Sequence, residues 1–318
     1  MVSCSKPITA ASLLVLHDAG KLNLNAVVFG PKGILKQFTP AYGAEVDPRL
    51  YEIQVIHLLQ HTAGWRSDIY PLRMSDTIST AMGAPAPADP VTIIRYMMGQ
   101  PLQDNPGAVY NYSNFGYCVL GRIIETISGG RQNYAGCVTS QVLVPLGVPR
   151  IIQGHSRLFQ AAPNEAYYYQ GGGYDGPSIQ RSVFPGGGMV EAPYGSFCLE
   201  SMDAPSGWIA SALDLARFAT AVTGRAGRSF LRPSSLELLA GSPTFTFTPA
   251  VDWWKTGNCP GSAAEVAVFR QSANIQYAVL FNSDPDTDWV RSPQANWVDM
   301  MSKAVFGVKS RPLKQPMF

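Results

Sequence analysis

The sequence of 318 residues has little charge, since only 14% of its residues are Asp, Glu, Lys or Arg and the formal net charge is +2. Basic residues form no run or stripe, so we expect no nucleic-acid partner. The sequence also lacks an uninterrupted apolar stretch of the roughly 18 residues that a membrane-spanning helix needs. Its 46% of hydrophobic residues is instead typical of a globular protein with a large core.

Cysteine is scarce and scattered: none of the five forms a Cys-x-x-Cys pair, and no histidine cluster accompanies them. We therefore assign no metal and no cofactor. Cys4 and Cys118 lie in apolar helical contexts, where a buried thiol is the default. A disulfide among Cys137, Cys198 and Cys259 stays open, and the cellular compartment is not indicated.

The sequence has no Gly-x-Ser-x-Gly pentapeptide, which argues against an α/β-hydrolase site. It does have one Ser-x-x-Lys pair, formed by Ser3 and Lys6. Residues three apart lie on one face of a helix, so Lys6 could activate Ser3 as a nucleophile without a histidine. The alternative is that Ser3 or Ser5 only caps the helix that begins here.

Apolar periodicity predicts several helices, with Pro7 tolerated in the first turn of the first one. Their expected ranges are 8–17, 55–59, 91–98, 114–128, 211–220 and 292–306. Two β-prone runs, at 264–270 and 275–280, predict a hairpin. His61 follows the second helix in a turn, where we expect a structural hydrogen bond and no catalytic role. Glycine runs at 171–173 and 186–188 are either surface loops or the rim of a substrate cleft.

Three separated motifs could form one site. They are the Ser-x-x-Lys pair, Tyr112-Ser113-Asn114, and Lys255-Thr256-Gly257. Each is weak alone, but in this order they closely resemble the serine β-lactamase and penicillin-binding-protein superfamily. The tyrosine of the second motif resembles the class C β-lactamase and esterase branch. Segments 58–64 and 207–218 also look like that family, so the resemblance covers essentially the whole chain.

The resemblance implies a serine hydrolase that works through an acyl-serine intermediate. Ser3 would attack the substrate carbonyl. Lys6 and Tyr112 would share the proton transfers, and which of the two is the formal base stays open.

The same resemblance implies a substrate-binding set. Asn114 would position the substrate, and Lys255, with Thr256 and Gly257 in the same motif, would supply positive charge for a substrate carboxylate. The backbone N–H groups of the nucleophile and of Asn258 would form the oxyanion hole.

For the fold, the resemblance implies one β-lactamase-related α+β domain over residues 1–318. An antiparallel sheet flanked by helices would use residues 1–54 and 226–318, and a mostly helical region would span roughly 55–225. Family members carry strands before the nucleophile that this sequence lacks. We therefore expect an N-terminally truncated domain with an unpaired sheet edge, or a homo-oligomer that covers this edge.

The expected substrate is a β-lactam, a D-amino-acid peptide or a small ester, and the Lys-Thr-Gly motif mildly favours a substrate with a carboxylate. The alternative function is a catalytically silent scaffold or binding protein that has kept the motifs.

Overall fold

The computed structural model describes residues 1–41, 43–66, 75–170, 177–223, 230–241, 246–248, 251–269, 275–283 and 304. Within them the largest sheet has four antiparallel strands in the order β5–β6–β7–β8. These strands are β5 (Thr246–Thr248), β6 (Val251–Cys259), β7 (Ser262–Phe269) and β8 (Ile275–Phe281). Two small antiparallel pairs join β1 (Ile152–Gln153) to β4 (Trp208–Ile209) and β2 (Ile179–Arg181) to β3 (Met189–Glu191).

Helices make up most of the remaining regular structure. The α-helices are α1 (Lys6–Asp18), α2 (Val55–Leu59), α3 (Ser75–Met82), α4 (Pro90–Met98), α5 (Asn114–Ile127), α6 (Tyr134–Val138), α7 (Asp203–Ser206), α8 (Ala212–Val222) and α9 (Pro233–Gly241). Single turns of other helix types are η1 (Val2–Ser5), η2 (Pro48–Glu52), η4 (Thr139–Leu143), η5 (Leu158–Gln160) and η7 (Glu200–Met202).

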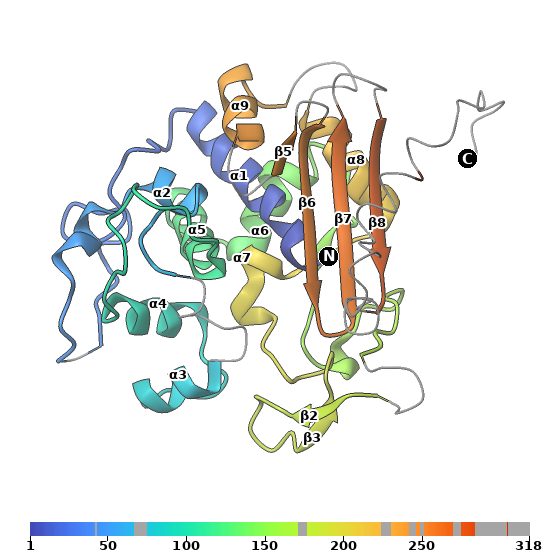
Figure 1. Ribbon diagram of the computed structural model, residues 1–318, viewed down its shortest axis with the longest axis horizontal. Helices are drawn as coiled ribbons and strands as arrows, with labels where there is room; N and C mark the ends of the chain where they lie inside the picture. Colours follow the sequence, from blue (N-terminus) through green and yellow to red (C-terminus); the bar gives the residue numbers. More distant parts are fainter. Residues whose placement is uncertain are drawn as a thin grey trace.

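Helix α1 lies between the sheet and the helical region, as Figure 1 shows. It packs against α5, α6 and α7, while α8 covers β7 and β8. Alternate residues of β7, Ala264, Val266 and Val268, are fully buried in the same core cluster as the apolar residues of α1. The residues between them, Ala263, Glu265 and Ala267, are buried as well, so both faces of this central strand are buried.

The amino-terminal turn η1 packs beside β6 (Figure 1). Among the described residues, β5 pairs with β6 only at Thr246↔Trp254 and Thr248↔Val251. From Lys255 onward the pairing of β6 with β7 continues to Cys259↔Ser262. The start of α1 and the Lys-Thr-Gly stretch of β6 are thereby brought side by side.

The α+β class is confirmed, and five of the expected helices correspond to α1, α2, α4, α5 and α8 with ends that differ by at most two residues. The expected hairpin corresponds to β7 and β8. The helix expected at 292–306 and the glycine run at 171–173 lie outside the described residues. The run at 186–188 forms the exposed turn between β2 and β3. Helices α3, α6, α7 and α9 were missed. All five cysteines are free thiols, so the disulfide that the sequence left open is not formed.

Candidate active site

The first motif lies at the start of α1. Val2–Ser5 form a 3₁₀ turn that runs into the α-helix, with Pro7 in its first turn. The Nζ atom of Lys6 lies 3.1 Å from Ser3 Oγ. Neither Ser3 nor Ser5 makes a side-chain capping bond, and Ser5 Oγ instead accepts a hydrogen bond from the backbone N–H of Trp208 at 3.2 Å. The helix-cap interpretation of these serines is therefore wrong.

The second motif meets the first at the start of α5. Ser113 caps this helix, since its Oγ accepts a hydrogen bond from Gly116 N at 3.0 Å. This cap leaves the two flanking side chains free to face the nucleophile. Tyr112 Oη lies 2.7 Å from Ser3 Oγ, and Asn114 Oδ1 lies 2.7 Å from Lys6 Nζ.

His61 holds the second motif in place. Its backbone carbonyl accepts a hydrogen bond from Asn111 N at 2.8 Å, and its Nδ1 accepts one from Ser113 N at 3.0 Å. Its ring centre lies 4.7 Å from that of Tyr112. Burial, and then the positive charges of Lys6 and Lys255, hold the pKa of His61 well below its usual value. The ring is therefore neutral, which Nδ1 needs in order to accept, and the expected structural role is what the contacts show.

The third motif reaches the same place from β6. Lys255 Nζ lies 4.6 Å from the centre of the Tyr112 ring. A Cβ added to Gly257 would lie 2.5 Å from the backbone N of Ser3, so glycine allows β6 to approach the nucleophile closely. Thr256 and Asn258 lie on the same strand, with Asn258 exposed to solvent. All eight residues that the sequence singles out thus lie on η1, α1, β6 or the start of α5.

The ionisable groups of the site are shifted toward their neutral forms. Burial, followed by the charge of Lys255, holds the pKa of Lys6 well below its usual range. Burial also lowers the pKa of Lys255, to about 8. For Tyr112, burial raises the pKa well above the usual value for a phenol, although its hydrogen bond with Ser3 opposes this. At neutral pH the arrangement favours a neutral phenol, and Lys6 is the group set up to lose its proton.

One contact of Lys6 has no signal in the sequence. Lys6 Nζ also donates a hydrogen bond to the backbone carbonyl of Pro205 in α7, at 3.0 Å. A backbone acceptor is independent of residue type, so no motif could reveal it. Cys4, next to the nucleophile, is buried and donates from Sγ to the carbonyl of Lys255 at 3.2 Å. Burial raises the pKa of this thiol to about 12, so it is not a competing nucleophile.

Within the described part of the chain, no three His, Cys, Asp or Glu side chains are grouped closely enough to hold a metal ion. Nor does any helix described there combine the length and the apolar character that crossing a membrane requires.

Comparisons with known proteins agree on the class of fold. A segment of 146 residues is 30% identical to Protein flp of Staphylococcus aureus (strain COL), a match that covers 46% of this chain and 26% of that protein. The chain thus aligns with about a quarter of the length of this curated relative.

Solved structures resemble the chain over nearly its whole length. The octameric penicillin-binding protein homologue from Pyrococcus abyssi superposes with a TM-score of 0.62 and 18% identity, over 96% of this chain and 65% of that one. The D-amino acid amidase from Ochrobactrum anthropi SV3, complexed with L-phenylalanine amide, gives 0.67 and 18%, over 97% and 84%. At these identities the likeness shows the fold alone.

Fold and sequence together place the chain in the β-lactamase and penicillin-binding-protein superfamily. The family model described as Beta-lactamase matches residues 1–297, and the chain belongs to this family.

Proposed function

We propose that the protein hydrolyses an acyl substrate through a covalent intermediate on Ser3. The observation that carries this proposal is the contact of Ser3 Oγ with Lys6 Nζ at 3.1 Å and with Tyr112 Oη at 2.7 Å. A nucleophile with two proton-transfer groups in hydrogen-bond reach is the arrangement that acyl transfer requires.

In the proposed mechanism Lys6 is the general base for acylation. A neutral Lys6 amine accepts the proton of Ser3 as Oγ attacks the carbonyl. Tyr112 keeps its proton, because its pKa is raised, and can donate it toward the leaving group. The Lys6 ammonium then returns its proton to the Tyr112 oxygen, since the two groups lie beside the same Ser3 Oγ atom, and both regain their starting protonation states. The reverse transfers activate water for deacylation.

Groups on β6 would stabilise the negative charge that develops on the substrate. Gly257 brings the strand against the backbone of Ser3, which supports an oxyanion hole made by the N–H groups of Ser3 and Asn258. Lys255 supplies a cation beside Tyr112. Asn114, which already contacts Lys6, would orient the substrate amide. Thr256 would bind the substrate from β6, the strand that also carries Lys255.

For the substrate we propose a carboxylate-bearing amide, either a β-lactam or a D-amino-acid peptide. The cation of Lys255 supports the carboxylate, and the structural likeness to a D-amino acid amidase is consistent with an amide bond. A small ester is the competing substrate. Nitrocefin, a D-Ala–D-Ala peptide and p-nitrophenyl butyrate, assayed in parallel, decide between them. Ester cleavage without cleavage of either amide would overturn the amide proposal.

A fluorophosphonate probe with intact-mass readout tests the nucleophile. We expect one adduct on the wild-type protein and none on Ser3→Ala. The matched control is Ser5→Ala. Ser5 is buried and its hydroxyl bonds to Trp208 N, so this substitution removes a nearby serine other than the nucleophile and should leave labelling unchanged. A folded wild-type sample that does not label would contradict the enzyme proposal and leave the silent scaffold.

Oligomerisation is a separate proposal. The Pyrococcus abyssi homologue is described as octameric, and a homo-oligomer of this chain would cover the outer sheet edge. Light scattering during size-exclusion chromatography measures the assembly, and a monomer at all concentrations would contradict it.

A further inference from the structure

We propose that Asp203 and Arg122 are positioning residues for Lys6: they fix the short helix α7, whose carbonyl groups orient the lysine amine toward Ser3. This inference rests on the proposed function insofar as Lys6 is the general base. It concerns residues about 120 and 200 positions away from the nucleophile, on α5 and α7.

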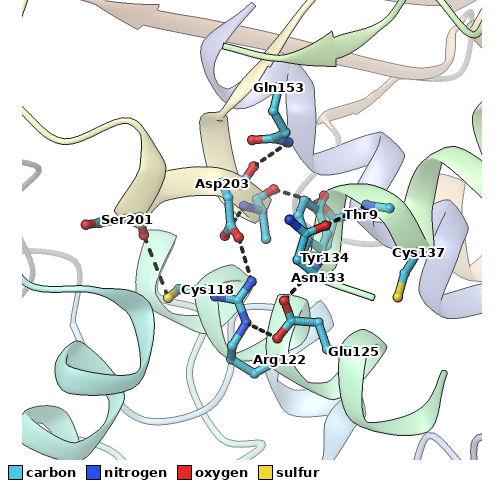
Figure 2. Close-up of polar contacts among 12 residues, drawn as sticks. Thr9, Cys118, Arg122, Glu125, Asn133, Tyr134, Cys137, Gln153, Ser201 and Asp203 are labelled. Atoms are coloured by element: carbon cyan, nitrogen blue, oxygen red, sulfur yellow. Dashed lines mark hydrogen bonds and ion pairs between the residues drawn. The ribbon is translucent and has the colours of Figure 1, made fainter. Parts of the chain in front are cut away.

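Helix α7 is too short to be stable by itself. It has four residues, Asp203–Ser206, and an isolated helix of one turn is unstable in water. Its conformation must therefore come from its contacts. At its start, Asp203 uses one carboxylate oxygen to accept from Ala204 N at 2.6 Å and the other to pair with Arg122 Nη2 at 2.5 Å. Figure 2 shows this carboxylate between the helix and the guanidinium.

Arg122 connects α7 to two further elements. Its side chain is 7% exposed, and its Nε lies 2.8 Å from Glu125 Oε2. The other oxygen of Glu125 accepts from Tyr134 N at 2.6 Å, at the start of α6 (Figure 2). Because a buried guanidinium needs charged partners, removing one carboxylate disturbs the whole arrangement. The close packing of Gly121 on Ala204, where an added Cβ would lie at 2.8 Å, places α7 directly on α5.

A chain of hydrogen bonds with one direction ends on the same helix. The indole N–H of Trp208 can only donate, and it donates to Tyr134 Oη at 2.9 Å. Tyr134 Oη must then donate to Thr9 Oγ1 at 2.6 Å, since Thr9 uses its own proton on the carbonyl of Ala204 at 2.6 Å. Thr9 lies one turn after Lys6 on α1, so two consecutive turns of α1 bond to two consecutive carbonyls of α7.

The carbonyl of Pro205 decides where the Lys6 lone pair points. A neutral amine has two N–H groups and one lone pair. Asn114 Oδ1 at 2.7 Å and the Pro205 carbonyl at 3.0 Å accept the two N–H groups. The lone pair is then directed at the third neighbour, Ser3 Oγ, at 3.1 Å. If α7 shifts, one N–H can turn toward Ser3 and the lone pair turns away from it.

Two sets of variants test the proposal through the acylation rate measured against pH. Asp203→Asn breaks the pair with Arg122, and Thr9→Val removes the hydroxyl while keeping the side-chain shape. We expect each to lower the rate at pH 7 by about 100-fold, the effect of a misplacement near 1 Å. We also expect the acid limb of the profile to move to higher pH. Burial is the main cause of the low pKa of Lys6, and a loosened α7 would admit water.

One control keeps the hydroxyl of residue 9, and the other removes a buried carboxylate elsewhere. Thr9→Ser keeps the hydroxyl and should keep the wild-type rate. Asp214→Asn removes a buried carboxylate of α8 that pairs with Arg150 at 3.0 Å. It should change the stability of the protein without changing the pH profile of the acylation rate. If Asp203→Asn does not fold, the comparison of Thr9→Val with Thr9→Ser decides. Folded Asp203→Asn and Thr9→Val proteins with the wild-type rate and acid limb would overturn the proposal.

A second readout separates this inference from the proposed function. In protein labelled with ¹³C at lysine Cε, the signal absent from Lys6→Arg reports the Lys6 titration without any substrate. We expect its pKa to rise in Asp203→Asn and in Thr9→Val but not in Asp214→Asn. An unshifted titration in the first two variants overturns the positioning role even if Ser3 is never acylated. A shifted titration in a protein that the probe does not label supports the positioning role and contradicts the proposed function.

Discussion

The Nζ atom of Lys255 lies 4.6 Å from the centre of the Tyr112 ring, so the third motif places a cation on the face of the aromatic ring that contacts the nucleophile. Because burial lowers the pKa of Lys255 to about 8, this charge is lost within an accessible pH range. An arginine at the same position would stay charged throughout.

Lys255→Arg should therefore change how substrate affinity depends on pH. For a carboxylate-bearing substrate, the wild-type KM should rise as the pH passes about 8, since Lys255 becomes neutral. In Lys255→Arg the rise should be absent up to pH 10. Steady-state kinetics from pH 6 to 10 measure both profiles, and p-nitrophenyl butyrate, which has no carboxylate, serves as control. The same alkaline rise in both proteins would contradict the assignment of Lys255 as the carboxylate-binding cation.

Lys255→Met should increase stability at neutral pH. The folded-state pKa is about 8, against an ordinary 10.5, so between these values the unfolded chain binds more protons and the stability of the wild type rises with pH. Below pH 8 the charged, partly buried lysine carries its full penalty. We expect Lys255→Met to be more stable by about 1–3 kcal/mol at pH 7. The gain should shrink toward pH 10.5, as urea unfolding at both ends of this range can show.

Asn114→Asp should move the activity to higher pH. A carboxylate 2.7 Å from Lys6 Nζ favours the ammonium form and should raise the pKa of Lys6 by about 1–3. The acylation rate at pH 7 should fall and recover on alkaline titration. Asn114→Leu is the matched control: it loses the acceptor without adding charge, so its loss should not recover with pH. Parallel profiles for the two variants would argue against Lys6 as the base.

His61→Ala should reduce both stability and acylation. The substitution leaves the buried N–H of Ser113 without its acceptor, which destabilises by about 1–3 kcal/mol. It also removes the ring that packs on Tyr112. His57→Ala is the matched control, because His57 Nδ1 accepts from Gln54 N at 3.2 Å at the start of α2. That variant should lose about 1 kcal/mol and keep the wild-type acylation rate. Equal acylation rates for the two variants would contradict a specific role of His61.

Gly257→Ala should abolish acylation. The added Cβ would lie 2.5 Å from Ser3 N and 2.9 Å from the carbonyl of Met1, which are backbone atoms that cannot turn aside. Gly116→Ala, in the first turn of α5, meets nothing closer than 3.6 Å and should be tolerated. Probe labelling of both variants, with circular dichroism as a check on folding, measures the difference. Normal labelling of Gly257→Ala would show that β6 does not need this close approach.

Elements with a strong local signal were predictable from the sequence. Helix α5 has an apolar stripe over four turns and Ser113 as a cap, and its start was placed at the observed residue, Asn114. The hairpin of β7 and β8 followed from two β-prone runs. Helix α3 was missed, because Ser75–Met82 has a mixed polar sequence in a proline-rich region. For such a segment, packing against α4 decides the conformation.

The candidate site was predictable from the sequence only where it is made of side chains, because residue type and spacing reveal side-chain chemistry alone. Ser3, Lys6, Tyr112 and Lys255 carry side chains with recognisable chemistry at recognisable spacing. The sequence did not decide whether Ser3 caps the helix, since a serine before an apolar run satisfies both patterns. The carbonyl of Pro205 was invisible, because every residue has a carbonyl and only the tertiary fold brings this one to Lys6.

The three hydrogen-bond partners of Lys6 are Ser3, Asn114 and Pro205, which lie far apart along the chain. In an unfolded chain Ser3 and Lys6 are already neighbours, yet the lysine is hydrated and protonated at pH 7, and the serine is as inert as any other. Under the proposed function, reactivity toward an acylating probe would therefore measure the fraction of molecules in which the segments with Asn114 and Pro205 have docked on α1. A nascent chain in which α5 and α7 have not yet been synthesised would therefore have no reactive serine.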